Sequence, residues 1–242
     1  MKSNYLKWYM AICKEKKNKK RKHYFFVKNK KIRMVMFNNI IPHNNYWQMA
    51  ACVVFFIFIF YFIGVQKYTI AAICAIAFAN YVAINLRVGV IQDKINETTV
   101  ENDYVARYVD WSITTPLLVL TILLRSKISN TSIFIFLLSL DVLMIYTGYL
   151  AAITQNVNRR YFLFAVSSFF YLLLFIMLFA LCGSTQPGLC IFLFFAWLVY
   201  PFLWILHRTP VNKPYLNNYN YDAAISMLDV FSKVGYGLLL PL

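Results

Sequence analysis

Long apolar stretches constrain this chain more than any other feature. Seven windows of roughly 20 residues, each bounded by polar or turn-forming segments, follow one another along the sequence from residue 46 onward. Because a backbone in lipid has to satisfy its polar groups within the segment, each window is predicted to be a helix. The predicted spans are 46–64, 68–88, 103–124, 132–154, 161–183, 189–207 and 222–241.

The composition supports a membrane assignment. Of the 242 residues, 61% are hydrophobic and only 14% are charged, whereas a soluble domain of this length needs many more charges on its surface. We therefore expect an all-α, multi-pass integral membrane protein whose main partner is the lipid bilayer. Its seven-transmembrane-helix bundle is predicted to occupy residues 46–242, preceded by a basic amino-terminal arm at residues 1–45.

The arm holds thirteen lysines and arginines and a single acidic residue, Glu15. A basic run can indicate either nucleic acid or anionic lipid as a partner. Directly before a first span, it favours a membrane-surface or topology role. We expect it to contact an anionic lipid surface, and we expect no nucleic-acid partner.

The five cysteines follow no metal-ligand spacing and are too few for a disulfide framework, so no metal site is expected. Cys182 and Cys190 flank a short loop and could meet in an oxidising compartment. Free thiols are nevertheless favoured, since Cys52 and Cys74 lie inside apolar spans and suit packing.

Charged residues inside the predicted spans are few, and each costs at least about 2.5–3.5 kcal/mol at mid-bilayer. Asp229 and Lys233 lie one turn apart on the seventh span. They indicate either an ion pair that only tolerates burial or a reactive amine suited to Schiff-base chemistry, and the spacing leaves both open. The other charges of this kind are Arg107, Asp110 and Asp141.

The third span places proton-capable side chains on one stripe of a helix. The alternative is structural: Asp110 pairs with Arg107 while the threonines bond to their own backbone. Acids and a lysine on separate helices favour a proton relay over this alternative. The stripe consists of Arg107, Asp110, Thr114, Leu118 and Thr121.

The sixth span carries Trp197, Tyr200 and Trp204 on one face, with Pro201 between them. Such a stripe is more often ordinary packing than a cofactor site. Opposite a buried lysine, however, it is also suited to form the apolar walls of a chromophore slot.

Three strings of residues carry most of the buried polar and aromatic positions. They are Arg-Tyr-Val-Asp-Trp-Ser-Ile-Thr-Thr-Pro-Leu-Leu from Arg107, Trp-Leu-Val-Tyr-Pro-Phe-Leu-Trp from Trp197, and Leu-Asp-Val-Phe-Ser-Lys-Val-Gly-Tyr-Gly from Leu228. These strings resemble the microbial rhodopsins, in their proton-pump-like branch. Weaker similarities lie at 76–81 and 141–148. The motifs occur in order on five helices within residues 46–242.

This resemblance implies all-trans retinal bound to Lys233 as a protonated Schiff base. Asp110 is then implied to be the counterion and first proton acceptor, and Asp229 the second counterion. Arg107 would help to hold their charges, and Thr114 would hydrogen-bond Asp110. Tyr81 would bond near Asp229. The residues implied to surround the retinal are Tyr81, Trp111, Thr115, Leu118, Met144, Gly148, Trp197, Tyr200, Pro201 and Trp204.

The sequence also departs from the pattern of this family. Thr121 stands where pumps usually carry a carboxylate donor, so reprotonation should be slow or water-mediated. The glutamate pair that releases protons in archaeal pumps is replaced by Thr209 and Tyr221, with Asp222 as the nearest acid. No histidine is expected near Asp110, because all three are placed at termini or in loops: His23, His43 and His207.

The function implied is a light-driven proton pump, not an enzyme, that moves protons toward the amino-terminal side of the membrane. One alternative is a sensory photoreceptor, which the lack of a carboxylate donor at Thr121 favours. The others are a retinal-binding protein without transport and a light-gated cation channel, as in some giant-virus rhodopsins. A channel is disfavoured because residues 68–88 contain no acid. The Lys-, Asn- and Phe-rich composition resembles that of large DNA viruses, and a trimer or pentamer would be ordinary for the family.

Two signals disagree on the orientation in the membrane. The family topology places the amino terminus outside, so pumping would be outward. The positive-inside rule favours the opposite, with nineteen basic residues on the amino-terminal side and three on the other. Glycosylation sequons at Asn96 and Asn130, on opposite sides of the third span, offer a test of this conflict.

Overall fold

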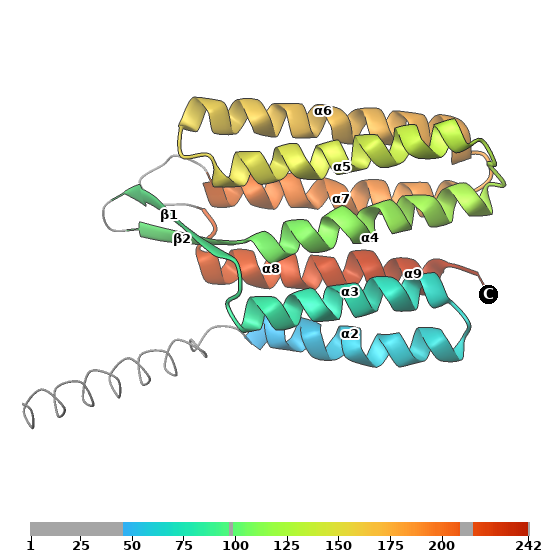
Figure 1. The fold of residues 1–242 in the computed structure, drawn as a ribbon, viewed down its shortest axis with the longest axis horizontal. Coiled ribbons are helices and arrows are strands. Elements are labelled where there is room, and N and C mark those ends of the chain that lie inside the picture. The colour runs from blue at the N-terminus through green and yellow to red at the C-terminus, as the bar shows by residue number, and fades with distance from the viewer. Residues whose placement is uncertain (1–45, 97–98, 209–214, 242) are drawn as a thin grey trace, which may run out of the picture. The chain divides into compact units, whose positions relative to one another are not determined.

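A computed structural model describes residues 46–96, 99–208 and 215–241. Long helices lie alongside one another in a bundle (Figure 1). The helices follow one another as α2 Tyr46–Gly64, α3 Tyr68–Asn85, α4 Val105–Arg125, α5 Thr131–Ile153, α6 Val157–Cys182, α7 Pro187–Arg208 and α8 Asn218–Val230.

The seventh helix of the bundle is not regular throughout. After α8, the chain continues through a π-helical segment, η1 Phe231–Gly235, into the short helix α9 Tyr236–Leu239. Helices adjacent in sequence pack against each other, and α8 closes the ring by packing on α2. The prediction of an all-α bundle of seven membrane helices is confirmed.

Six of these helices, α2 to α7, are long and apolar enough to cross a membrane. Large apolar side chains such as Phe60, Phe169 and Phe202 point outward and are exposed, as expected where lipid replaces water. The predicted spans agree closely with the helices. The second ends earlier, at Asn85, and the third begins later, at Val105.

A β-hairpin between α3 and α4 was missed by the sequence analysis, which placed only a loop and the start of a span there. Strands β1 Val90–Asn96 and β2 Thr99–Tyr104 pair antiparallel, with Val90 opposite Tyr104. The hairpin is polar and short, so it carries neither the length nor the apolar periodicity of a span. Gly89, with a φ of 71°, turns the chain into β1.

Asparagine side chains cap three of the helices. Asn130 accepts hydrogen bonds from the Ser132 and Ile133 amides at 2.9 and 3.4 Å, which satisfies free N–H groups at the start of α5. Asn156 and Asn217 cap α6 and α8 in the same way. The cap at Asn130 agrees with the predicted break between the third and fourth spans. Residues 209–214, between the sixth and seventh predicted spans, lie outside the described residues, as does the basic arm.

Cys52, Cys74, Cys182 and Cys190 are free thiols. The preference for free thiols over a Cys182–Cys190 disulfide is therefore confirmed for these four. Cys13 lies outside the described residues.

Gly237 permits a close approach of α9 to α2 and α3. A Cβ at this position would lie 2.5 Å from Ile70 Cγ2 and 2.5 Å from Phe62 Cζ, and both of these side chains are buried. Gly237→Ala is therefore expected to lower the free energy of unfolding by about 1–3 kcal/mol, because the packed neighbours must shift. Thermal unfolding in detergent, followed by tryptophan fluorescence, measures this.

Gly64→Ala is the matched control, because a Cβ at Gly64 would meet nothing within 4 Å. Equal midpoints for the two variants would show that the contact at Gly237 does not limit stability.

Candidate functional site

Lys233 lies at the centre of the bundle, on the π-helical segment η1. Its side chain is buried, and Nζ donates a hydrogen bond to Oδ2 of Asp110 on α4. Nζ also lies 3.6 Å from Oδ1 of Asp229, which precedes Lys233 by four residues and lies in α8. The amine is thus placed between two buried carboxylates, the pairing that a charge inside a membrane requires.

The two carboxylates differ in how fully they are hydrogen-bonded. Asp229 accepts from Tyr81 Oη at 2.8 Å, Trp111 Nε1 at 2.9 Å and Tyr200 Oη at 2.6 Å. Among the described residues, Oδ1 of Asp110 has no hydrogen-bond partner. Three donors therefore occupy the Asp229 carboxylate, while one oxygen of Asp110 accepts no hydrogen bond from the described residues.

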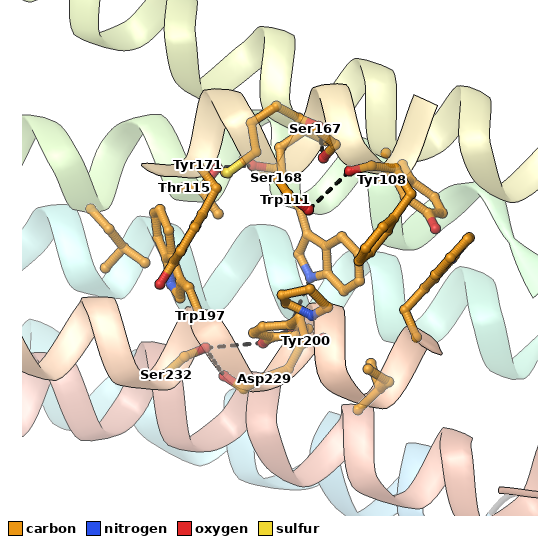
Figure 2. Close-up of a pocket in the computed structure, with 18 of the residues that line it drawn as sticks. Tyr108, Trp111, Thr115, Ser167, Ser168, Tyr171, Trp197, Tyr200, Asp229 and Ser232 are labelled. Atoms are coloured by element: carbon orange, nitrogen blue, oxygen red, sulfur yellow. Dashed lines mark hydrogen bonds between the residues drawn. The ribbon is translucent and has the colours of Figure 1, made fainter. Parts of the chain in front are cut away.

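A cavity lies next to the amine, between α4, α5, α6, α7 and the α8–η1 segment (Figure 2). The labelled side chains of Trp111, Trp197 and Tyr200 project into it, and Tyr200 reaches Asp229 and Ser232. Its walls are apolar and aromatic, as in sites that bind small organic molecules. Of the residues expected around the retinal, those that line the cavity are Trp111, Thr115, Leu118, Met144, Gly148, Trp197, Tyr200, Pro201 and Trp204.

The remaining predicted contact, Tyr81, does not line the cavity and instead acts through its hydrogen bond to Asp229. Ring contacts fix the walls in place. The Trp111 and Tyr200 rings meet edge to face at 5.1 Å, and Phe164 stacks on Trp204 at 4.6 Å.

Helix α6 contributes one wall that the sequence analysis did not name. Phe164, Ser167, Ser168 and Tyr171 all line the cavity. They follow the three- and four-residue spacing of one helix face, so this periodicity was the signal that would have found them. Other lining residues that were not predicted are Tyr108, Ile145, Tyr221, Ile225 and Ser232.

The threonines of α4 bond to their own helix. Thr114 Oγ1 donates to the main-chain carbonyl of Asp110 at 2.9 Å, rather than to its carboxylate. Thr115 Oγ1 donates to the carbonyl of Trp111 at 2.7 Å, and Thr121 Oγ1 to that of Leu118 at 2.6 Å. This is the structural role that the sequence analysis kept as an alternative.

Arg107 pairs with an aspartate at the start of α8. Its Nη2 lies 2.7 Å from Asp222 Oδ1, while the guanidinium also lies over the ring of Tyr104 at 4.9 Å. The ion-pair partner of Asp110 is Lys233. The alternative in which Arg107 pairs with Asp110 is therefore not what the fold adopts, because α8 brings Asp222 to the arginine.

His207 corrects a prediction. It was placed at a terminus or in a loop, yet it lies in the last turn of α7 and is buried. Its ring stacks on that of Tyr221 at 4.1 Å, and Nδ1 lies 3.1 Å from the Leu216 carbonyl oxygen. The reason is tertiary: α7 continues to Arg208, and α8 supplies the aromatic ring that covers the imidazole. His23, His43 and Thr209 lie outside the described residues.

Comparison with known proteins identifies the family. Residues 39–242 match the family described as bacteriorhodopsin-like protein. Archaerhodopsin-2 of Halobacterium sp. (strain aus-2) is 32% identical over 176 residues, which cover 68% of this chain and 67% of the relative. Bacteriorhodopsin of Haloterrigena sp. (strain arg-4) is 32% identical over 182 residues, with 69% and 70% covered.

Solved structures agree with this assignment. The thermophilic rhodopsin of Rubrobacter xylanophilus superimposes with a TM-score of 0.70 at 27% identity, covering 81% of this chain and 93% of that one. The light-driven proton pump rhodopsin of Coccomyxa subellipsoidea superimposes with a TM-score of 0.73 at 24% identity, covering 82% and 96%. The chain therefore belongs to the bacteriorhodopsin-like protein family and is a multi-pass integral membrane protein.

Proposed function

We propose that this protein is a light-driven proton pump that carries all-trans retinal on Lys233 and moves protons toward the amino-terminal side of the membrane. One observation carries the proposal. A buried amine at an aromatic cavity lies between two carboxylates, of which one is fully hydrogen-bonded and the other keeps an oxygen without a partner among the described residues. The names of relatives support it, since one solved neighbour is a light-driven proton pump.

The residues present fit retinal. An apolar slot with one amine suits a polyene aldehyde, and Trp111, Trp197 and Trp204 supply flat walls. Gly148 keeps the slot open, because a Cβ there would lie 3.2 Å from Ser167 Oγ. When bound, retinal supplies absorption of visible light and an isomerisation that reorients its bond to the lysine nitrogen.

The protein side chains then decide where the proton goes. In the dark, two carboxylates favour a protonated Lys233 nitrogen. Once the nitrogen is displaced from this arrangement, Asp110 accepts its proton on the free oxygen. Three donors already bond to Asp229, so its oxygens are less available for this proton. The asymmetry of the two acids therefore gives the transfer its direction.

On the amino-terminal side of the site, Arg107 of α4 forms an ion pair with Asp222, which lies near the start of α8. Asp222 is also the acid that the sequence offered as the nearest substitute for the missing glutamate pair. Its side chain is partly exposed, at 17%, while that of Arg107 is buried. We infer that this pair separates the site from the amino-terminal surface, where a proton that leaves Asp110 emerges.

The direction relative to the cell depends on the orientation of the chain. With the amino terminus outside, as in the usual family topology, the same transfer pumps protons outward. With the amino terminus inside, as the basic residues favour, it pumps them inward. The sign of a pH change in the medium separates the two.

A sensory photoreceptor is the second candidate, favoured by one observation. Thr121 carries no carboxylate at the position of the usual proton donor, and a slow return of the proton would lengthen the lifetime of a signalling state. A cation channel is less well supported, because α3 contains no acidic residue that would line a cation path.

Illumination of cells that express the protein with retinal is expected to change the pH of an unbuffered suspension. A protonophore should abolish the change, because it dissipates a gradient that only active transport builds. A pH electrode measures both the size and the sign of the shift. A coloured preparation that bleaches with hydroxylamine but gives no shift would overturn the pump and favour the photoreceptor.

A further inference from the structure

A second cavity, of about 680 Å³, lies at the end of the bundle where α2 joins α3. Its volume leaves room for several water molecules. The residues described around it are Gly64, Val65, Gln66, Lys67, Tyr68, Thr69, Ile70, Thr121, Leu124, Arg125, Leu240 and Pro241. None of these is acidic, so no carboxylate in this lining can act as a proton donor.

Thr121 connects this cavity to a buried tyrosine. Its hydroxyl lies 2.5 Å from the hydroxyl of Tyr236, a side chain with no exposed surface. Thr121 Oγ1 also donates to the carbonyl of Leu118 at 2.6 Å. Because the Thr121 hydroxyl proton points to the Leu118 carbonyl, the Thr121 oxygen can accept a hydrogen bond from the Tyr236 hydroxyl. Two hydroxyls bonded in this way can exchange donor and acceptor roles by rotating.

Tyr236 lies on the helix that carries the amine. It follows Lys233 by three residues, which is close to one turn, and starts α9 directly after the π-helical segment. Its hydroxyl also lies 3.4 Å from the Leu118 carbonyl oxygen, and Leu118 itself lines the first cavity together with Lys233. The hydroxyl pair therefore stands between the second cavity and the cavity of the amine.

We propose that Thr121 and Tyr236 form a hydroxyl relay that returns protons to the Lys233 nitrogen, in place of a carboxylic acid donor. This rests on the proposed pump function. Water in the second cavity gives a proton to Thr121 and leaves toward the surface as hydroxide. Thr121 passes its own proton to Tyr236, and Tyr236 passes its own to water that enters past Leu118. That water protonates the nitrogen. Each hydroxyl gains one proton and loses one, so neither remains charged.

Tyr236→Phe tests the relay, because it removes one hydroxyl and keeps the ring. After a flash, the state with a deprotonated Lys233 nitrogen is expected to decay about tenfold or more slowly, since a positioned proton carrier is lost. Transient absorbance in detergent or nanodiscs measures the decay. The solvent deuterium isotope effect on the decay should also change, whereas a purely structural role of Tyr236 would leave it the same.

Tyr68→Phe is the matched control. Tyr68 lines the same cavity but is exposed, and the substitution removes the same hydroxyl group. Its decay should equal that of the unaltered protein. Equal slowing in both variants would overturn the relay, because the effect would then belong to the cavity rather than to the Thr121–Tyr236 pair.

Thr121→Asp provides a rescue. A carboxyl at this position carries its own proton, so Tyr236→Phe should slow the decay much less in the Thr121→Asp background.

Retinal-free protein gives an independent readout: the infrared C–O stretch of Tyr236, isolated by subtracting the Tyr236→Phe spectrum, should shift in Thr121→Val. An unshifted band would show that the two hydroxyls are not bonded and would overturn the relay.

These outcomes are separate from a failure of the pump itself. If no deprotonated state forms after the flash in the unaltered protein, the proposed function fails. If the state forms and decays at the same rate in Tyr236→Phe, the pump stands and the relay is wrong.

Discussion

Lys233→Arg is expected to abolish visible absorption and light-driven proton transport completely. Arginine keeps a positive charge between Asp110 and Asp229, so the ion pairs that make burial tolerable can persist. A guanidinium does not provide the free amine that a Schiff base with an aldehyde requires. Absorbance spectra of the purified protein, after addition of all-trans retinal, measure the loss.

The same substitution at Lys127, an exposed lysine in the turn after α4, is the control. Lys127→Arg should regenerate a coloured protein with normal yield. A visible band that survives in Lys233→Arg and still bleaches with hydroxylamine would show that retinal is attached to another residue.

Asp110→Asn is expected to leave the protein coloured but to slow proton transfer from the Lys233 nitrogen by about 100-fold or more. The amide cannot accept the proton, while its size preserves the packing of α4. We also expect absorption at a longer wavelength, because the negative charge beside the nitrogen stabilises the ground state more than the excited state. Flash photolysis and a visible spectrum test both effects.

Asp141→Asn is the corresponding control on α5. Asp141 is also buried, but its carboxylate oxygens have no hydrogen-bond partner among the described residues, and Lys233 pairs with the other two acids. Transport should persist in this variant. If Asp141→Asn stopped transport and Asp110→Asn did not, the roles assigned to the two acids would be wrong.

Asp110 and Asp229 show why position alone is a weak guide to chemical role. Both are buried aspartates near one amine, and both are placed there by simple helix periodicity. Their difference comes from three donors on α3, α4 and α7 that all converge on Asp229. Removing a donor, rather than an acid, should therefore shift proton acceptance toward Asp229.

Much of the fold follows from the sequence, for a physical reason. In lipid, each apolar stretch must form its own hydrogen bonds, so the helix assignment is a local property. The buried charges stood out in the same way, because their cost in a membrane makes each one exceptional. Lys233, Asp110 and the aromatic face of α7 were therefore singled out from composition and spacing, while their roles are implied by the resemblance to microbial rhodopsins.

What the sequence by itself determined is thus the set of helices and the buried lysine, while the resemblance to microbial rhodopsins supplied about half of the residues that line the cavity. Only the tertiary structure decided that Arg107 pairs with Asp222, that Asp110 keeps a free oxygen, and that Tyr236 meets Thr121. The Arg107–Asp222 and Thr121–Tyr236 contacts each join residues on different helices that are 115 positions apart in the sequence. Local periodicity sets on which face of its helix a side chain lies. The packing of the helices against one another decides which residues of the neighbouring helix that side chain contacts.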